Sequence, residues 1–259
     1  MDLTRQLTRS SETAISPESW RSSPGGYAGI GLETTRALIS AGATVIVPAR
    51  DREKAIKALG SMPGAELELL DLMDPESINR FAHRFLASER TVHVLINNAA
   101  IMGAPLVRDA RGYESQFATN HLGHLQLTAE LWPALRRADG ARVVSVSSRG
   151  HVHVRAYDRW IAYGQSKSAN ALFAVALDAI GPEDRRARRG NQRLVYHQPA
   201  ARRARRRLLR ELDIAVAVPA DSAELLGVRP WAIDPEFANR LWSLSERLTG
   251  VGIPTPFAS

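Results

Sequence analysis

The sequence predicts a single α/β domain, residues 1–259, built around a doubly wound parallel sheet. Short apolar runs rich in β-branched residues alternate along the chain with longer segments of helical periodicity, which is typical of βαβ units. A glycine-rich stretch, Gly25–Gly31 (GGYAGIG), leads into the first of these helical segments. A chain of 259 residues, 44% of them hydrophobic, is also long enough to bury one sizeable core.

Four runs have the composition of buried strands. Thr44–Val47 consists of β-branched residues, and both Val92–Ile96 and Arg142–Val146 are rich in valine. Glu66–Asp71 contains three leucines before it ends on a polar residue. Because each run is followed by a helical segment, we expect the four strands to lie parallel in one sheet.

Helical segments alternate with these runs along the chain. Asp74 and Pro75 open one helix, since an aspartate suits the N-cap and a proline suits the first turn. The other segments show apolar residues at helical spacing. These expected helices cover residues 29–42, 51–59, 160–180 and 111–137, the last with a kink or an end near Pro133.

The spacing of Gly25, Gly29 and Gly31 predicts a phosphate cradle of the Rossmann type. Glycines let a pyrophosphate approach the helix N-terminus closely, where free N–H groups and the helix dipole favour anions. A flexible turn is the alternative that a glycine-rich loop alone leaves open. After the next strand, Arg50 favours the 2′-phosphate of NADP(H) over NAD(H), although Asp51 could instead bind the ribose of NAD.

Tyr163 and Lys167 lie four residues apart in the last expected helix, so their side chains share one helix face. A nearby ammonium lowers the pKa of a phenol and turns it into a proton donor and acceptor for a carbonyl and alcohol pair. An unrelated surface pair is the alternative. Only three of the 34 basic residues are lysines, which makes a chance pairing less frequent.

With these motifs in order, the chain resembles the short-chain dehydrogenase/reductase family, in its retinol dehydrogenase-like and WW-domain-oxidoreductase-like branch. The resemblance covers residues 25–180, with an echo in Gly227–Ala232 and Leu241–Trp242. The motifs that carry it are the glycine loop, Arg50, Asp71–Leu72, Asn97–Ala100 (NNAA), Asn120 within FATNHLG, Ser147–Ser148, Tyr163 and Lys167.

The resemblance implies a role for each matching residue. Ser148, or its neighbour Ser147, would bond the substrate oxygen, and Tyr163 would transfer the proton. Lys167 would lower the pKa of the tyrosine and bind the nicotinamide ribose, and Asn120 would hold a relay water. The implied cofactor-binding residues are Gly25, Gly29, Ile30, Gly31, Arg50, Asp71, Leu72, Asn98, Ala99, Tyr163 and Lys167.

Other properties follow as expectations. The substrate is a small carbonyl compound or alcohol, the cofactor is NADP(H), and a homodimer would form through helices 111–137 and 160–180. His121 and His124 are expected to be surface or packing residues, and no metal site is expected. The chain contains no cysteine and no apolar run long enough to span a membrane, which indicates a cytoplasmic enzyme.

Three segments depart from the family pattern. Residues before Gly25 are polar where an apolar first strand belongs, and Pro24 stands in place of a threonine. A one-base shift can convert Trp20–Pro24 into Val-Ala-Val-Val-Thr, so we hypothesise out-of-frame sequence over residues 15–24. The loop from Ser148 to Tyr163 is short. Residues 181–212 are irregular and arginine-rich, so the sixth strand and the substrate lid are expected to be missing or scrambled, with Arg193–His197 as a weak strand candidate.

Two alternatives to a working oxidoreductase remain open. The chain could be a catalytically impaired paralogue that keeps only a partial Rossmann core, followed by a C-terminal remnant over residues 213–259. It could also bind nucleic acid through the eleven arginines between Arg185 and Arg210. These arginines exceed the whole net charge of +7, so the positive charge is confined to this segment and does not mark the entire domain as a nucleic-acid binder. Nucleic acid is the less favoured partner.

Overall fold

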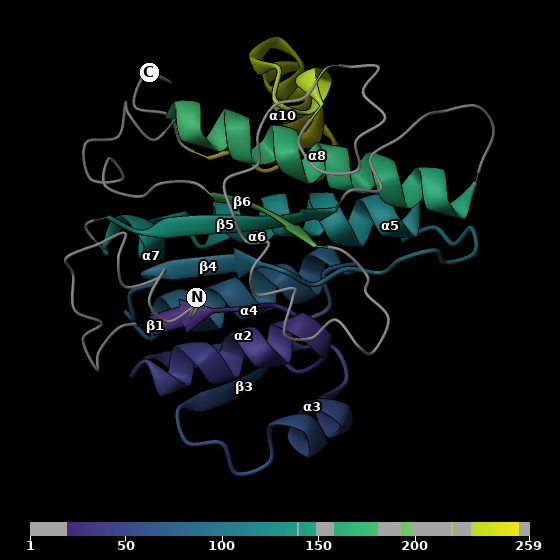
Figure 1. Cartoon of the computed structure of the whole chain (residues 1–259). Helices are drawn as coiled ribbons and strands as arrows, with labels where there is room; N and C mark the ends of the chain where they lie inside the picture. Colours follow the sequence, from purple (N-terminus) through teal and green to yellow (C-terminus); the bar gives the residue numbers. More distant parts are fainter. Residues whose placement is uncertain are drawn as a thin grey trace.

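The computed structural model describes residues 20–138, 140–148, 158–180, 193–197, 219 and 229–253. Within them a six-stranded sheet has the order β3-β2-β1-β4-β5-β6, and every neighbouring pair of strands is parallel (Figure 1). This order is that of a doubly wound dinucleotide-binding sheet, and it confirms the predicted fold class. The strands are β1 (Trp20–Ser22), β2 (Thr44–Ala49), β3 (Ala65–Leu69), β4 (Val94–Asn97), β5 (Arg142–Ser148) and β6 (Arg193–His197).

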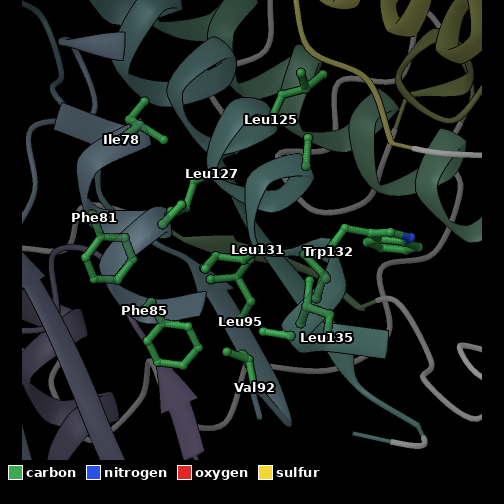
Figure 2. Packing of buried hydrophobic residues seen from close by; sticks show 14 of the residues in the cluster. Ile78, Phe81, Phe85, Val92, Leu95, Leu125, Leu127, Leu131, Trp132 and Leu135 are labelled. Atoms are coloured by element: carbon green, nitrogen blue, oxygen red, sulfur yellow. The ribbon is translucent and has the colours of Figure 1, made fainter. Parts of the chain in front are cut away.

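The helices cover both faces of the sheet. Alternate residues of β2 show the division: Ile46 packs in one hydrophobic cluster, whereas Val45 and Val47 pack in the other. The first cluster joins side chains of α4, α6 and α7 to the sheet, and Figure 2 shows its aromatic and leucine side chains. The helices are α2 (Gly29–Ser40), α3 (Arg52–Leu59), α4 (Pro75–Ala87), α5 (Ser115–Phe117), η1 (Ala118–Leu122), α6 (Gly123–Glu130), α7 (Trp132–Arg136), α8 (Arg159–Ile180), η2 (Pro230–Ala232) and α10 (Pro235–Thr249).

The helix expected over residues 111–137 is divided into several pieces. It begins at Ser115, because the Asp109 carboxylate accepts hydrogen bonds from the N–H groups of Arg111 and Tyr113 and holds the preceding residues in a turn. A π-helical segment, η1, follows α5. The helix breaks at Leu131, and Pro133 lies in the first turn of α7, as the expected kink near this proline indicated.

The first and sixth strands, which were expected to be lost, are both present as short strands. β1 has three residues and pairs with β2 and β4 at the centre of the sheet. β6 occupies the weak candidate Arg193–His197 and pairs with β5, which corrects the expectation of a missing sixth strand. Main-chain pairing explains both, since a ladder of N–H and C=O groups requires no particular side chains. Apart from β6, residues 181–212, where the substrate lid is expected to be missing or scrambled, lie outside the described residues.

The last residue of the central strand and the residue after it carry hydroxyl groups where the sheet is buried. Ser22 and Ser23 are almost completely buried, and neither hydroxyl has a hydrogen-bond partner among the residues that the structure describes. Leaving a buried polar group without its bond costs about 1–3 kcal/mol. The polar composition of this segment is therefore a stability cost that the fold carries at its centre.

The C-terminal helix α10 packs on α8 and η1, the region where we expected a second copy of the chain (Figure 1). The rings of Phe173 and Trp242 stack at a centroid distance of 5.7 Å, and the ring of His121 bonds Ser245 at 2.8 Å. Residues Gly123–Ala129 of α6 are all buried as well. A partner at the expected dimer surface would therefore have to bind around α10 of the same chain.

No helix in the described part of the chain combines the length and the apolar character needed to cross a membrane.

Candidate active site

The glycine loop and the end of β4 pack together at the point where the strand order reverses. Gly25 has a φ of +76°, and a Cβ atom on it would lie 2.9 Å from the Cα atom of Ala99. A Cβ atom on Gly31 would overlap the carbonyl oxygen of Gly25 and lie 2.6 Å from Nδ2 of Asn98. Glycine is required at both positions because no side chain fits between these segments. Ligands of open α/β sheets bind in this crevice.

Space for a phosphate exists at the start of α2. Gly29 has a φ of +51°, and a Cβ atom on it would meet nothing within 4 Å. Within the described residues no side chain caps the helix at Ala28, so the N–H groups of its first turn, including those of Ile30 and Gly31, are available for an anion. These residues fit the pyrophosphate of a dinucleotide cofactor.

Arg50 and Asp51, the two candidates for contact with the adenosine ribose, differ in their surroundings. Asp51 caps α3, since its Oδ1 atom accepts a hydrogen bond from the N–H of Lys54 at 2.9 Å. Arg50 is exposed directly after β2. Asp71 follows β3, and its carboxylate accepts a bond from the N–H of Met73. Leu72 is buried against α6: a Cβ atom on Gly123 would overlap the carbonyl oxygen of Leu72.

Ser148, Tyr163 and Lys167 converge at the carboxyl end of β5. Ser148 is the last residue of β5 and forms a hydrogen bond with the Tyr163 side chain. Nζ of Lys167 lies 5.6 Å from the centroid of the Tyr163 ring and donates to the carbonyl oxygen of Val146 at 3.1 Å. The hydroxyl of Ser147 instead donates to the carbonyl oxygen of Lys167 at 2.6 Å. This bond leaves Ser148 as the serine that faces the tyrosine.

The pKa of Tyr163 is shifted in the direction opposite to the expected one. Burial raises the pKa of this phenol, and the hydrogen bond with Ser148 lowers it by a smaller amount. The spacing of Tyr163 and Lys167 predicted proximity correctly, but it said nothing about desolvation, which penalises phenolate. The phenol is therefore protonated at neutral pH and suited to donate a proton.

Lys167 is an ammonium group held in the protein interior. Its side chain is almost completely buried, and burial lowers its pKa from 10.5 to about 8. At pH 7 the group is still mainly charged, so it can stabilise a phenolate that forms on Tyr163. The fold thus maintains a buried charge at a cost in stability.

Substitution Lys167→Met should remove this cost. The folded-state pKa of about 8 lies below the unfolded value of 10.5, so the unfolded chain binds more protons between these pH values and stability rises with pH across that window. The rise amounts to about 3 kcal/mol. We expect urea unfolding at pH 7.5–10.5 to show it in the wild-type chain but not in Lys167→Met. Lys54→Met, which replaces an exposed lysine, should keep it.

Asn120 acts as a clamp in this structure. Its amide nitrogen donates to the carbonyl oxygen of Ile101 and to the hydroxyl of Ser166, each at 2.9 Å, and its Oδ1 accepts from the N–H of Ile101. Both N–H groups of this side chain are thus used within the protein, and the relay water stays a prediction. The main-chain oxygen of Asn120 bonds the ring of His124. The side chain therefore fixes the loop after β4 to α8.

Gln116 is a second clamp, and the sequence interpretation missed it. This fully buried residue lies one turn before Asn120; its Oε1 accepts from the N–H of Gly103 at 2.8 Å, and its Nε2 donates to the carbonyl oxygen of Arg159 at 2.9 Å. The available signal was the spacing of two amide side chains, which share a helix face when four residues apart.

His121 and His124 were expected to be surface or packing residues, and both are buried packing residues. Burial lowers the pKa of His121 to about 3 and that of His124 to about 4. Both rings are therefore neutral at physiological pH.

Comparison with known proteins gives a family match over the same region. A model of the family described as short chain dehydrogenase matches residues 24–180. Human retinol dehydrogenase 12 is 34% identical over 269 residues, which cover 88% of this chain and 85% of that protein. A probable oxidoreductase from Streptomyces antibioticus is 43% identical over 169 residues, or 58% of this chain and 56% of the relative. The chain thus spans about half the length of several curated relatives that it matches.

Solved structures show the same fold. An uncharacterized protein from Mycobacterium paratuberculosis is 33% identical with a TM-score of 0.73, and the match covers 91% of this chain and 95% of that one. The RhlG/NADP active-site complex from Pseudomonas aeruginosa is 24% identical with a TM-score of 0.60, covering 88% and 89%. The second likeness is evidence of the fold alone.

Proposed function

The chain belongs to the short-chain dehydrogenase family, and from this premise we propose that it is an NADP(H)-dependent oxidoreductase acting on a carbonyl compound or alcohol. The observation that carries the proposal is the convergence of Ser148, Tyr163 and Lys167 at the carboxyl end of β5, in the same sheet edge as the phosphate cradle. Several relatives are retinol dehydrogenases by name, which supports an alcohol or aldehyde as the substrate.

On this geometry we assign each residue a part in carbonyl reduction. The Ser148 hydroxyl donates a hydrogen bond to the substrate oxygen and holds it beside Tyr163. Tyr163 gives its proton to that oxygen, and the Lys167 ammonium stabilises the phenolate that results. A bound nicotinamide cofactor supplies the hydride for the carbonyl carbon. In the reverse direction the phenolate removes the proton of the alcohol.

The preference for NADP(H) rests on Arg50. Its exposed guanidinium follows β2, where the ribose of a dinucleotide is bound, and the rival carboxylate of Asp51 is engaged in capping α3. A guanidinium matches a phosphate group in charge and in geometry.

Substitution Arg50→Ala should therefore erase the cofactor preference. We expect wild-type kcat/KM with a saturating aldehyde to be higher for NADPH than for NADH. In the variant it should fall about 10- to 100-fold for NADPH, as loss of charged hydrogen bonds predicts, and change little for NADH. Absorbance at 340 nm follows both reactions, and Arg240→Ala on α10 is the control. A variant that keeps the wild-type preference would refute the assignment, and no turnover by the wild-type chain with either cofactor would refute the proposed function.

The remaining expectations stay predictions. They are the cytoplasmic location and the homodimer. The arginine-rich segment that suggested nucleic-acid binding lies mostly outside the described residues. The alternative of an impaired paralogue has one specific observation in its favour, the unpaired hydroxyls of Ser22 and Ser23 in the central part of the sheet.

A further inference from the structure

Lys167 shares its hydrogen-bond acceptor with a second buried side chain. The carbonyl oxygen of Val146 accepts from Nζ of Lys167 and from Nδ2 of Asn170, each at 3.1 Å. Lys167 and Asn170 are three residues apart on α8, so their side chains leave the same helix face, and both are almost completely buried. A carbonyl oxygen has two lone pairs, so the two donors fill it. Each donor therefore limits where the other can lie.

The sheet leaves the Val146 oxygen open to these side chains. The N–H of Arg142 in β5 bonds the carbonyl oxygen of His93, so every second residue of β5, Val146 included, directs its main-chain groups toward β4. β4 ends at Asn97, which pairs with Ser145. The carbonyl group of Val146 therefore lies past the end of β4, where side chains of α8 can reach it.

Hydrogen bonds rather than ion pairs hold the ammonium within the described part of the chain. None of the ion pairs among the described residues includes Lys167. The titratable groups that act on it are Tyr163 on α8 and His124 on α6, and both are uncharged at neutral pH. The position of the ammonium therefore depends on its acceptor and on the side chain that shares this acceptor.

A series of buried side chains holds Asn170 in turn. Asn170 forms a side-chain hydrogen bond with His121, and Nε2 of this histidine lies 2.8 Å from Oγ of Ser245 on α10. The ring of His121 also packs between Phe117 and Phe173, at centroid distances of 5.1 and 6.2 Å. Asn170, His121 and Ser245 are all almost completely buried, so water competes little for these bonds. The series connects the C-terminal helix α10, which packs on α8 (Figure 1), to the acceptor of the ammonium.

We propose that Asn170 is a positioning residue: through the shared acceptor it holds the Lys167 ammonium where it stabilises a phenolate on Tyr163. Nζ lies 5.6 Å from the centroid of the tyrosine ring, and the interaction of two charges weakens with distance. The bond with His121 fixes Asn170, so the C-terminal helix supports the reaction site without touching the substrate. This inference rests on the proposed function, since it concerns the step in which the phenolate forms.

Asn170→Ala tests the role in turnover. The variant vacates one lone pair of the shared acceptor, so the ammonium can take either position and stabilises the phenolate less. With NADPH and an aldehyde that the wild-type chain reduces, we expect kcat to fall about 10-fold and KM for the aldehyde to change less than about twofold. Ser245→Ala should show a smaller effect of the same kind. Asn79→Ala on α4 also removes a hydrogen-bonded amide, and it should keep kcat within about twofold of the wild-type value.

Asn170→Asp tests the geometry without turnover. Its carboxylate matches the amide in shape, lies beside the ammonium, and should raise the pKa of Lys167 from about 8 toward the unfolded value of 10.5. A group with equal folded and unfolded pKa values contributes no pH dependence. The rise in stability between pH 7.5 and 10.5 should therefore shrink by at least about half in Asn170→Asp and persist in Asn170→Ala and Asn79→Asp. Urea unfolding measures it, and a general loss of packing would lower stability without removing this dependence.

The outcomes distinguish the positioning role from the proposed function. An undiminished rise in Asn170→Asp, or a kcat of Asn170→Ala within twofold of the wild-type value, overturns the positioning role alone. Absence of turnover for every aldehyde in the wild-type protein overturns the proposed function, and the positioning role falls with it, whatever the unfolding of Asn170→Asp shows.

Discussion

Substitution Tyr163→Phe is expected to lower kcat about 10³-fold with any substrate that the wild-type protein reduces. The phenol is the proton donor in the proposed mechanism, and general acid catalysis contributes typically 10²- to 10⁴-fold. Phenylalanine fills the same buried space, so the fold and the cofactor cradle should persist. The lost groups are the hydroxyl and its bond with Ser148. Steady-state turnover of NADPH with an aldehyde measures the effect.

Tyr113→Phe is the matched control. It also removes a tyrosine hydroxyl with a hydrogen bond, in this case to the carbonyl oxygen of Leu248 in α10 at 3.2 Å. This variant should keep a kcat within about twofold of the wild-type value, since the lost bond is worth only about 1 kcal/mol of stability. Equal activity of Tyr163→Phe and wild type would eliminate Tyr163 as the proton donor.

Restoring apolar residues in and beside β1 should stabilise the protein more than any surface change. In the double variant Ser22→Val and Ser23→Val, two buried hydroxyls without partners are replaced by methyl groups at the centre of the sheet. We expect the free energy of unfolding to rise by about 2–4 kcal/mol, which corresponds to roughly 5–15 °C in the melting temperature of a chain of this size. Chemical denaturation and thermal melting measure both quantities.

Alanine variants guard this test against overpacking. Ser22→Ala and Ser23→Ala remove the hydroxyls without adding volume, so each should still stabilise by about 1 kcal/mol. Ser40→Ala, at the exposed end of α2, should change stability little. Destabilisation in both alanine variants would contradict the claim that these hydroxyls are unsatisfied. The same two positions become valine in the shifted reading frame, so the coding DNA over residues 15–24 is an independent check on that hypothesis.

The sequence predicted most strands and helices well, because these elements depend on patterns of apolar side chains. The β-branched run beginning at Thr44 and the helix around Tyr163 both formed within a few residues of their expected bounds. β1 was harder to predict, because its three residues are held by main-chain pairing with strands on either side. The residues of β1 show no alternation or apolar run, so a strand that forms through pairing with β2 and β4 could not be predicted from them.

The candidate site shows a similar division. Glycine spacing predicted a tightly packed loop before α2, and at Gly25 and Gly31 the structure indeed leaves no room for a Cβ atom. The sign of the Tyr163 pKa shift could not be predicted, since it depends on burial by segments distant in the sequence. The partners of Gln116 could not be predicted either, because both are main-chain groups of segments that the fold brings beside it.

The binding of NADPH to the wild-type chain and to Tyr163→Phe tests the central claim most directly, because it requires no knowledge of the substrate. At an NADPH concentration of 100 times Kd, ligand binding stabilises the folded state by about 2.7 kcal/mol, or roughly 5–10 °C in melting temperature. Both proteins should show this rise, and only the wild-type chain should then oxidise NADPH when an aldehyde is added. An unchanged melting temperature for the wild-type chain with saturating NADPH and with saturating NADH would contradict the account.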